Sequence, residues 1–407
     1  MTAQTWRRIV IVGAGHAGGR AAINLRQMGY AGELIIVGDE THPPYERPPL
    51  SKAVLVGKAH ADTTHLQHFD AWATSGIALR LGCRVTGIER ETKRVLLADG
   101  DMLPYDALIL ATGARARSFP GACDTDANPH LLRSLSDVAR LRPALISGAR
   151  IGVLGAGFIG LEVASSALEL GAQPVVIEAA SRPLARLLPA AFAGWLTQRA
   201  RESGVVFRFD TRVQQIVRDA LVLADGERLT VDATVVGIGA LPNDELARDA
   251  DLATDDGVLV DVQCRTSDPA VFAIGDVARR AATTTRAASR IESWRNAEDD
   301  ARRVAAALLG APLPADGVPW FWTDVFGHNI QLTGDLREDL EQVTHGDPQG
   351  GPFIVFYLAG DRLRGAIGVD CGRDLRAAQK LIARGERVDR VSLPRPKAAR
   401  CPADASV

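Results

Sequence analysis

The chain has 407 residues, of which 46% are hydrophobic and 24% charged, and its formal net charge is −2. This length predicts two or three domains, and the composition is that of a soluble globular protein. The nearly neutral charge argues against a general attraction to nucleic acid or to anionic membranes.

The N-terminal segment and the cysteines bear on the compartment. No apolar run approaches the ~20 residues of a membrane-spanning helix. The segment MTAQTWRRIVIVGAG runs directly into a strand pattern, which leaves no room for a signal peptide. The five cysteines (83, 123, 264, 371 and 401) form no CxxC pair and no metal-ligand spacing. We therefore expect reduced thiols in a cytoplasmic protein.

A dinucleotide-binding pattern opens the chain. In RIVIVGAGHAGGRAAINLRQMG, an apolar strand leads into Gly13-x-Gly15-x-x-Gly18, which we call the first glycine turn, and then into a segment with helical periodicity. A second strand, ELIIVGDE, reaches Asp39, 21 residues after Gly18. Glycines suit the tight turn and the close approach of a pyrophosphate, and the acid suits a ribose hydroxyl. This order of elements predicts a nucleotide site.

The pattern recurs in ARIGVLGAGFIGLEVASSALELGAQPVVIEA. Gly155-x-Gly157-x-x-Gly160, the second glycine turn, is followed 18 residues later by Glu178. Two complete patterns predict two nucleotide domains. A carboxylate bonded to the ribose diol favours NAD, whereas NADP needs a cation for its 2′-phosphate. Because the nearest arginine, Arg182, is four residues on, we expect NADH rather than NADPH.

Two further strands lie on either side of the second glycine turn. YDALILATGAR (105–115) ends in small residues, and TSDPAVFAIGDVA (266–278) ends in Gly275-Asp276. A strand ending in Gly-Asp can direct its carboxylate at a ribityl hydroxyl, although each segment alone is equally typical of an ordinary turn.

Together these segments resemble a known family. RRIVIVGAGHAG, PYERPPLSK, ATGAR, GAGFIGLE, GIGALPN, TSDPAVFAIGD, RIESWRNA and PWFWTD are similar to segments of the FAD-dependent ferredoxin reductases of Rieske dioxygenase and bacterial P450 systems. This family, which includes biphenyl dioxygenase reductase and putidaredoxin reductase, belongs to the glutathione-reductase superfamily. The resemblance covers nearly the whole chain, and RPPLSK with PWFW is its most specific part.

The resemblance implies an α/β fold with two Rossmann-like dinucleotide-binding domains and a small C-terminal α+β domain. The expected bounds are 1–117 and 241–314 for a discontinuous FAD domain, 118–240 for an NADH domain and 315–407 for the C-terminal domain. In that last region, short alternating strands precede the helical segment DLRAAQKLIARG.

The loop PYERPPLSK (44–52) bears on the redox mechanism. Disulfide reductases of the superfamily carry a redox-active cysteine pair in this region, whereas here no cysteine occurs before Cys83. No thiol can relay electrons there, so they must pass from the flavin to an acceptor that comes to it. The resemblance implies that Lys52 lies near flavin N5 and pairs with Glu162, and that both are catalytic. Without the resemblance, Lys52 would be interpreted as a solvated lysine of a surface loop.

The resemblance also implies the cofactor contacts, whereas the spacing of the cysteines and histidines predicts no metal site. For non-covalently bound FAD the expected residues are Gly13, Gly15, Ala17, Gly18, Asp39, Arg47, Lys52, Val85, Ala111, Gly113, Arg133, Asp276 and Trp294. For NADH as co-substrate they are Gly155, Gly157, Phe158, Ile159, Gly160, Glu178 and Gly239. Phe158 is expected to cover the flavin or, alternatively, only to pack.

Several features bear on the partner. The segment from Asp361 to Arg400 holds eleven Arg or Lys against five Asp or Glu, which suits a small acidic [2Fe–2S] ferredoxin or, equally, a solvated face. Trp320 and Trp322 are interpreted either as core or as residues beside the flavin edge. Asp300 and Val325 depart from the family pattern and put the choice of partner in doubt. The histidines at 60, 65 and 68 are more typical of a surface than of a metal site.

The sequence thus predicts an oxidoreductase, a ferredoxin–NAD(+) reductase. NADH would pass a hydride to FAD, and single electrons would then go to a ferredoxin that supplies a Rieske dioxygenase or a P450, as in aromatic hydrocarbon catabolism. Two alternatives stay open: an NADH-dependent reductase of a quinone or of monodehydroascorbate, and a slowly reduced redox-sensing flavoprotein.

Overall fold

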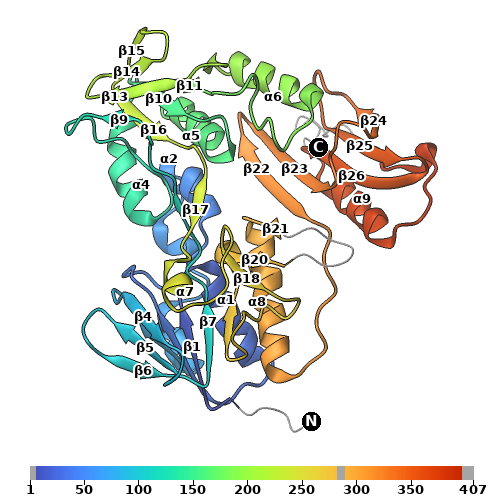
Figure 1. Ribbon diagram of the computed structural model, residues 1–407. Coiled ribbons are helices and arrows are strands. Elements are labelled where there is room, and N and C mark those ends of the chain that lie inside the picture. Colours follow the sequence, from blue (N-terminus) through green and yellow to red (C-terminus); the bar gives the residue numbers. More distant parts are fainter. Residues whose placement is uncertain (1–5, 282–288, 397–407) are drawn as a thin grey trace, which may run out of the picture. The chain divides into compact units, whose positions relative to one another are not determined.

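The computed structural model describes residues 6–281 and 289–396 (Figure 1). The chain forms two compact units, each built from three separate segments. The first unit contains residues 1–49, 59–116 and 240–316, and the second contains residues 50–58, 117–239 and 317–407. The domain bounds expected from the sequence stay a prediction.

A five-stranded parallel sheet forms the centre of the first unit. Its order is β19-β7-β1-β2-β3, which places the strand that leads into Gly275 in the same sheet as the N-terminal strand. The strands are β1 (Arg8–Val12), β2 (Glu33–Val37), β3 (Ile77–Arg80), β7 (Ala107–Leu110) and β19 (Val271–Ala273).

Both faces of this sheet are covered, because its strands are apolar at nearly every position. On one face Ile9, Ile11 and their neighbours pack with α1 (His16–Gln27) and α8 (Trp294–Leu309). On the other face Val10 and Val12 pack with residues of the antiparallel strands β4 (Val85–Glu89), β5 (Arg94–Leu97) and β6 (Met102–Pro104). The smaller elements of the unit are η2 (Ala61–Thr64), α3 (Phe69–Thr74), β8 (Ala114–Ala116), β17 (Ala240–Pro242), α7 (Glu245–Asp249), β18 (Val258–Val260), η4 (Gly275–Val277), β20 (Ala278–Arg280) and β21 (Ser289–Arg290).

The second unit holds a second parallel sheet, in the order β12-β11-β10-β16. Its strands are β10 (Arg150–Leu154), β11 (Gln173–Ile177), β12 (Val206–Arg208) and β16 (Ala233–Val236). One face packs on a sheet of β9 (Ala122–Cys123), β13 (Val213–Val217), β14 (Ala220–Leu223) and β15 (Arg228–Thr230). The helical elements are η1 (Pro48–Ser51), α2 (Ala53–Val56), α4 (Leu135–Leu141), η3 (Arg142–Ala144), α5 (Phe158–Glu169) and α6 (Ala190–Glu202).

The C-terminal part of the second unit is an antiparallel sheet with one helix. The sheet order is β22-β23-β26-β25-β24, and α9 (Gly372–Arg384) packs its apolar side on it through Leu375 and Ala378 (Figure 1). The strands are β22 (Trp320–Val325), β23 (His328–Gly334), β24 (Glu341–Gly346), β25 (Phe353–Ala359) and β26 (Arg362–Val369), and η5 (Arg390–Ser392) follows the helix.

The fold class predicted from the sequence, two Rossmann-like sheets and a small C-terminal α+β part, is confirmed. Among the helices of the described residues, none is both long and apolar enough to cross a membrane.

Candidate functional site

The first glycine turn joins β1 to α1 and leaves no space for a side chain at Gly13 or Gly18. Gly13 has a φ of +116°, and a Cβ there would lie 2.2 Å from the carbonyl oxygen of Ala111. A Cβ on Gly18 would lie 2.1 Å from the carbonyl oxygen of Gly13. At Gly15, by contrast, the nearest atom is 3.9 Å away, on Arg47. The N-terminus of a twelve-residue helix therefore faces open space beside a guanidinium, an arrangement that fits a pyrophosphate.

The second glycine turn repeats this geometry between β10 and α5. A Cβ on Gly155 would lie 2.5 Å from the carbonyl oxygen of Gly237, and one on Gly160 would lie 2.0 Å from that of Gly155. Gly157 again has its nearest neighbour 3.9 Å away. Ile159, in the first turn of α5, is exposed. This turn also fits a dinucleotide.

Glu178 lies at the carboxyl end of β11, next to the second glycine turn. Its carboxylate accepts hydrogen bonds from the amides of Ala156, at 2.8 Å, and Ala180, at 2.9 Å. These bonds hold the acid where the pattern expects a ribose ligand. Gly239 has a φ of +106° and lies just after β16, the strand that pairs with β10 in the parallel sheet of the second unit.

In the first unit, the Gly275-Asp276 turn packs on the first glycine turn. Gly275 has a φ of +69°, and a Cβ there would lie 2.8 Å from Cβ of Ala17. Trp294 begins α8; its ring lies 5.3 Å from the ring of His16, and its indole N–H donates to Glu46 at 3.2 Å. The structure therefore brings together the ends of β1, β7 and β19 with the start of α8.

Glu40 is a site residue that the sequence analysis missed. Asp39, the acid expected from the pattern, is exposed, whereas its neighbour Glu40 accepts hydrogen bonds from the Tyr45 hydroxyl at 2.6 Å and from Arg47 at 2.9 Å. Burial acts to lower the pKa of Arg47, but Tyr45 and Glu40 beside it outweigh this effect and raise the pKa. The sequence did offer a signal for this: Glu40 is a second acid at the strand end, and Tyr45 and Arg47 follow it closely.

Lys52 and Glu162 form the ion pair that the resemblance implies, within the second unit. The ammonium lies 2.6 Å from Oε1 of Glu162, which is 3% exposed. Thr323 also donates to Oε1, at 2.6 Å, and the Ser51 hydroxyl donates to Oε2. Thr323 was not predicted; the only signal was its place after PWFW.

Strand β22 packs its inner side along helix α5. The rings of Phe321 and Phe158 lie 4.0 Å apart, and the amide of Phe326 donates to Ser165 at 2.8 Å. Side chains alternate across a strand, so Trp320 and Trp322 lie on the other side, where their rings stack 5.0 Å apart. Phe158 thus has a packing partner in Phe321, which agrees with the alternative interpretation of that residue.

The remaining predicted residues are divided between the two units. Arg133 belongs to the second unit, where its amide donates to Asp137 at 3.0 Å, and Val85 is buried at the start of β4. Ala111 and Gly113 follow β7. Asp300 and Val325 are each 2% exposed, so neither presents its side chain to a partner.

The three histidines do not form a metal site. His60 and His68 pair with Asp62 and Asp70 on the surface. In residues 6–281 and 289–396, no group of three or more His, Cys, Asp or Glu side chains could hold a metal ion.

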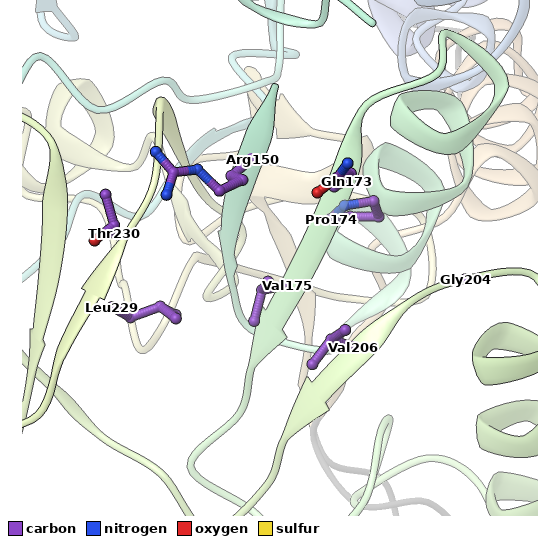
Figure 2. A pocket seen from close by; sticks show the side chains of 8 residues that line it. All are labelled: Arg150, Gln173, Pro174, Val175, Gly204, Val206, Leu229 and Thr230. Carbon is purple, nitrogen blue, oxygen red and sulfur yellow. The ribbon is translucent and has the colours of Figure 1, made fainter. Parts of the chain in front are cut away.

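The second unit has a surface pocket of about 500 Å³ beside its parallel sheet (Figure 2). Arg150, Gln173 and Val206, which line it, are the first residues of β10, β11 and β12. The glycine turn and Glu178 are at the opposite, carboxyl ends of these parallel strands, where ligands of such sheets bind. The pocket is therefore separate from the nucleotide site.

Known protein families match almost the whole chain. Residues 7–301 match the pyridine nucleotide-disulphide oxidoreductase family, and residues 320–399 match the reductase C-terminal family. The chain is 43% identical to the ferredoxin–NAD(+) reductase component of the anthranilate 1,2-dioxygenase system of Burkholderia cepacia, over 95% of this chain and 97% of the relative. It is 40% identical to the corresponding component of the 3-phenylpropionate/cinnamic acid dioxygenase of Photorhabdus laumondii, over 93% and 97%.

Solved structures agree with these relatives. The reductase in the covalent putidaredoxin reductase–putidaredoxin complex superimposes with a TM-score of 0.89 at 36% identity, over 95% of each chain. The ferredoxin reductase of the CYP199A2 system from Rhodopseudomonas palustris gives a TM-score of 0.89 at 34% identity, over 95% of this chain and 97% of that one.

Proposed function

Because the chain belongs to the pyridine nucleotide-disulphide oxidoreductase family, we propose that it is an NADH-dependent reductase of a small [2Fe–2S] ferredoxin. The resemblance to ferredoxin reductases of oxygenase systems, stated from the sequence, is confirmed by relatives of the same length. The observation that carries the proposal is the pair of glycine turns, each at the carboxyl end of its own parallel sheet, in a chain without a cysteine in residues 1–82.

FAD and NADH are the two nucleotides of this family. Bound FAD would take a hydride from NADH and release the two electrons singly. We assign FAD to the first glycine turn, with Arg47 and Asp276 beside it and Trp294 at the start of α8. NADH is assigned to the second glycine turn, with Glu178 as its ribose ligand. The helix N-terminus at each turn compensates the charge of a pyrophosphate.

The Lys52–Glu162 pair supplies a fixed charge. Glu162 is held by Thr323 and Ser51 as well as by the lysine, so the ammonium is kept in one orientation. A preorganised cation stabilises negative charge that develops during the reaction and needs no reorganisation to do so. By the resemblance, we assign this role to Lys52 at the flavin.

The docking surface proposed for the ferredoxin includes helix α9. Arg373, Arg376, Lys380 and Arg384 are all exposed. Their spacing of three, four and four residues places them along one side of the helix. A basic row of this kind suits an acidic partner and acts mainly on the rate of association.

The test uses the purified, FAD-loaded protein under anaerobic conditions. We expect fast bleaching of the flavin by NADH, slow bleaching by NADPH, and cytochrome c reduction that depends on an added [2Fe–2S] ferredoxin. Equal turnover without ferredoxin would replace the proposal with a small-molecule reductase. Slow bleaching by NADH would instead favour a redox sensor.

A further inference from the structure

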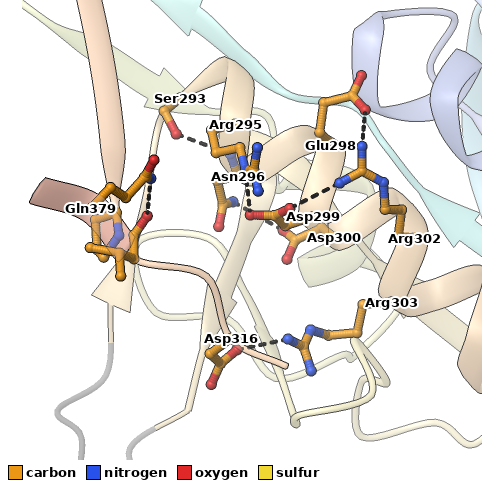
Figure 3. Close-up of polar contacts among 12 residues, drawn as sticks. Ser293, Arg295, Asn296, Glu298, Asp299, Asp300, Arg302, Arg303, Asp316 and Gln379 are labelled. Atoms are coloured by element: carbon orange, nitrogen blue, oxygen red, sulfur yellow. Dashed lines mark hydrogen bonds and ion pairs between the residues drawn. The ribbon is translucent and has the colours of Figure 1, made fainter. Parts of the chain in front are cut away.

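Asp300 is a buried carboxylate that belongs to none of the expected cofactor contacts. It lies on α8 and is 2% exposed. Its Oδ1 accepts a hydrogen bond from Arg280 at 2.6 Å. Its Oδ2 accepts from the amide of Gly275 at 3.2 Å. It also accepts from the side chain of Asn296, on the same helix, at 3.0 Å (Figure 3). Such a group is retained in a protein interior only where its partners compensate the loss of water.

The contact with Gly275 connects Asp300 to the proposed FAD site. Gly275 adopts a positive φ and packs against Ala17 of the first glycine turn, and Asp276 is the next residue. The bond from its amide to Asp300 fixes the orientation of the Ile274–Gly275 peptide, the first peptide of the turn that ends in Asp276. Helix α8, which begins with Trp294, is thereby tied to the end of β19.

Arg280 balances the charge of Asp300. It is the last residue of β20, three residues after the η4 turn, and pairs with Asp316 at 3.0 Å as well as with Asp300. Asp316 also pairs with Arg303 at 2.7 Å and is itself largely exposed (Figure 3). Burial raises the pKa of Asp300, and Arg280 beside it opposes that shift. Asp300 and Asp316 thus share one arginine. They differ in that Asp300 also accepts a hydrogen bond from the Gly275 amide.

We propose that Asp300 is a positioning residue for FAD, which holds the Gly275-Asp276 turn in its binding orientation before the cofactor arrives. The proposal rests on the function proposed above, since it assumes that FAD binds at the first glycine turn. A side chain that preorganises a site in this way strengthens binding because the cofactor has less ordering to perform.

The test measures FAD binding to the full-length apoprotein of Asp300→Asn and of its matched control, Asp316→Asn. Asparagine at 300 has one acceptor oxygen, so its N–H₂ group must face either Arg280 or the two donors on the other side, the Gly275 amide and Asn296. Asp316→Asn removes a carboxylate from the same arginine without touching Gly275. We expect the dissociation constant of FAD to rise about tenfold or more in Asp300→Asn, as for loss of a hydrogen bond to a charged group. It should change less than about threefold in Asp316→Asn.

Melting temperatures of apo and FAD-loaded protein separate positioning from plain stability. If Asp300 positions the turn, FAD raises the melting temperature of Asp300→Asn less than that of the wild type. An equal rise would overturn the proposal. If Asp300→Asn does not fold, the same measurement is made on Asp300→Ser, whose shorter side chain gives up the bond to the Gly275 amide. A rise in the dissociation constant of FAD supports the proposal, and an unchanged value contradicts it. Wild-type apoprotein that binds no FAD would reject the proposed function itself, and this inference with it.

Discussion

The ammonium of Lys52 and the carboxylate of Glu162 lie 2.6 Å apart, although 110 residues separate them in the chain. Glu162 is also bound by Thr323 from the C-terminal sheet and by Ser51. Three chain segments of the second unit thus converge on one carboxylate, and this convergence fixes where the positive charge lies.

Replacing Lys52 with methionine should lower the rate constant for flavin reduction by NADH about 100-fold, because a preorganised charge is lost. The affinity for NADH should change little, since the lysine does not belong to the second glycine turn. Stopped-flow measurements at several NADH concentrations separate the two quantities. Lys58→Met is the control: Lys58 pairs with Glu169 at 2.7 Å but is largely exposed. Equal rates in the two variants would contradict the role given to Lys52.

Glu178→Gln should reduce kcat/KM for NADH by about 10- to 100-fold without creating NADPH activity. Both carboxylate oxygens now accept from backbone amides, so a glutamine must turn its N–H₂ group against one of these donors. NADPH should stay a poor substrate because Arg182, the nearest arginine along the chain, is bound to Glu338 at 2.8 Å. Steady-state kinetics with both nucleotides test this. Glu202→Gln, which breaks a surface pair with Arg199, should leave both values unchanged.

Reversing three charges on α9 (Arg373→Glu, Arg376→Glu and Lys380→Glu) should raise KM for an acidic ferredoxin roughly tenfold at low salt. Flavin reduction by NADH should stay at the wild-type rate. The KM of the wild type should rise with ionic strength, and that of the triple variant should respond weakly or in the opposite direction. A salt dependence identical to that of the wild type would place the ferredoxin on another surface.

Acid should weaken the contact between α1 and α8. Burial raises the pKa of Glu298, but the hydrogen bond from His16 and the charge of Arg20 outweigh this effect, so the pKa in the folded protein is lowered. The stability that Glu298 contributes is therefore present above its ordinary pKa, which is 4.5, and is lost as the pH falls through the lowered value.

Glu298→Gln should consequently lower the melting temperature at pH 7 by about 2–4 °C and flatten its decline between about pH 5 and pH 3. Scanning calorimetry of the wild type and of Glu298→Gln over this pH range tests whether the difference between their melting temperatures shrinks as the pH falls. As a control, Glu202→Gln removes an exposed partner of Arg199 and should follow the wild-type curve.

The parts of the fold that the sequence predicted are those encoded locally. Gly13, Gly18, Gly155 and Gly160 are required by backbone that packs against backbone, so a spacing of a few residues reveals them. Apolar strands covered on both faces identify the two parallel sheets. The C-terminal helix and strands follow from periodicity in the same way.

The contacts that sequence reasoning missed join distant segments. Thr323 reaches Glu162 across 161 residues, and no local pattern marks a threonine in a strand as a ligand of a helix. Asp300 lies in a helix whose spacing does not reveal that its carboxylate meets the Gly275 amide. Glu40 was missed because the pattern is satisfied by either of two adjacent acids, Asp39 or Glu40. Only the fold shows that Glu40 is the one that accepts a hydrogen bond from Arg47.

The strand order of the first unit has a consequence for synthesis of the protein. All four residues of β7 are buried, and β7 lies between β1 and β19. The ribosome completes β7 at residue 110 but reaches β19 only at residue 271, a delay on the order of ten seconds or more at usual elongation rates. Throughout this interval an apolar strand has an unpaired edge, the kind of surface that aggregates or recruits chaperones. We therefore expect the nascent chain to expose this edge until β19 has been made and the central sheet can close.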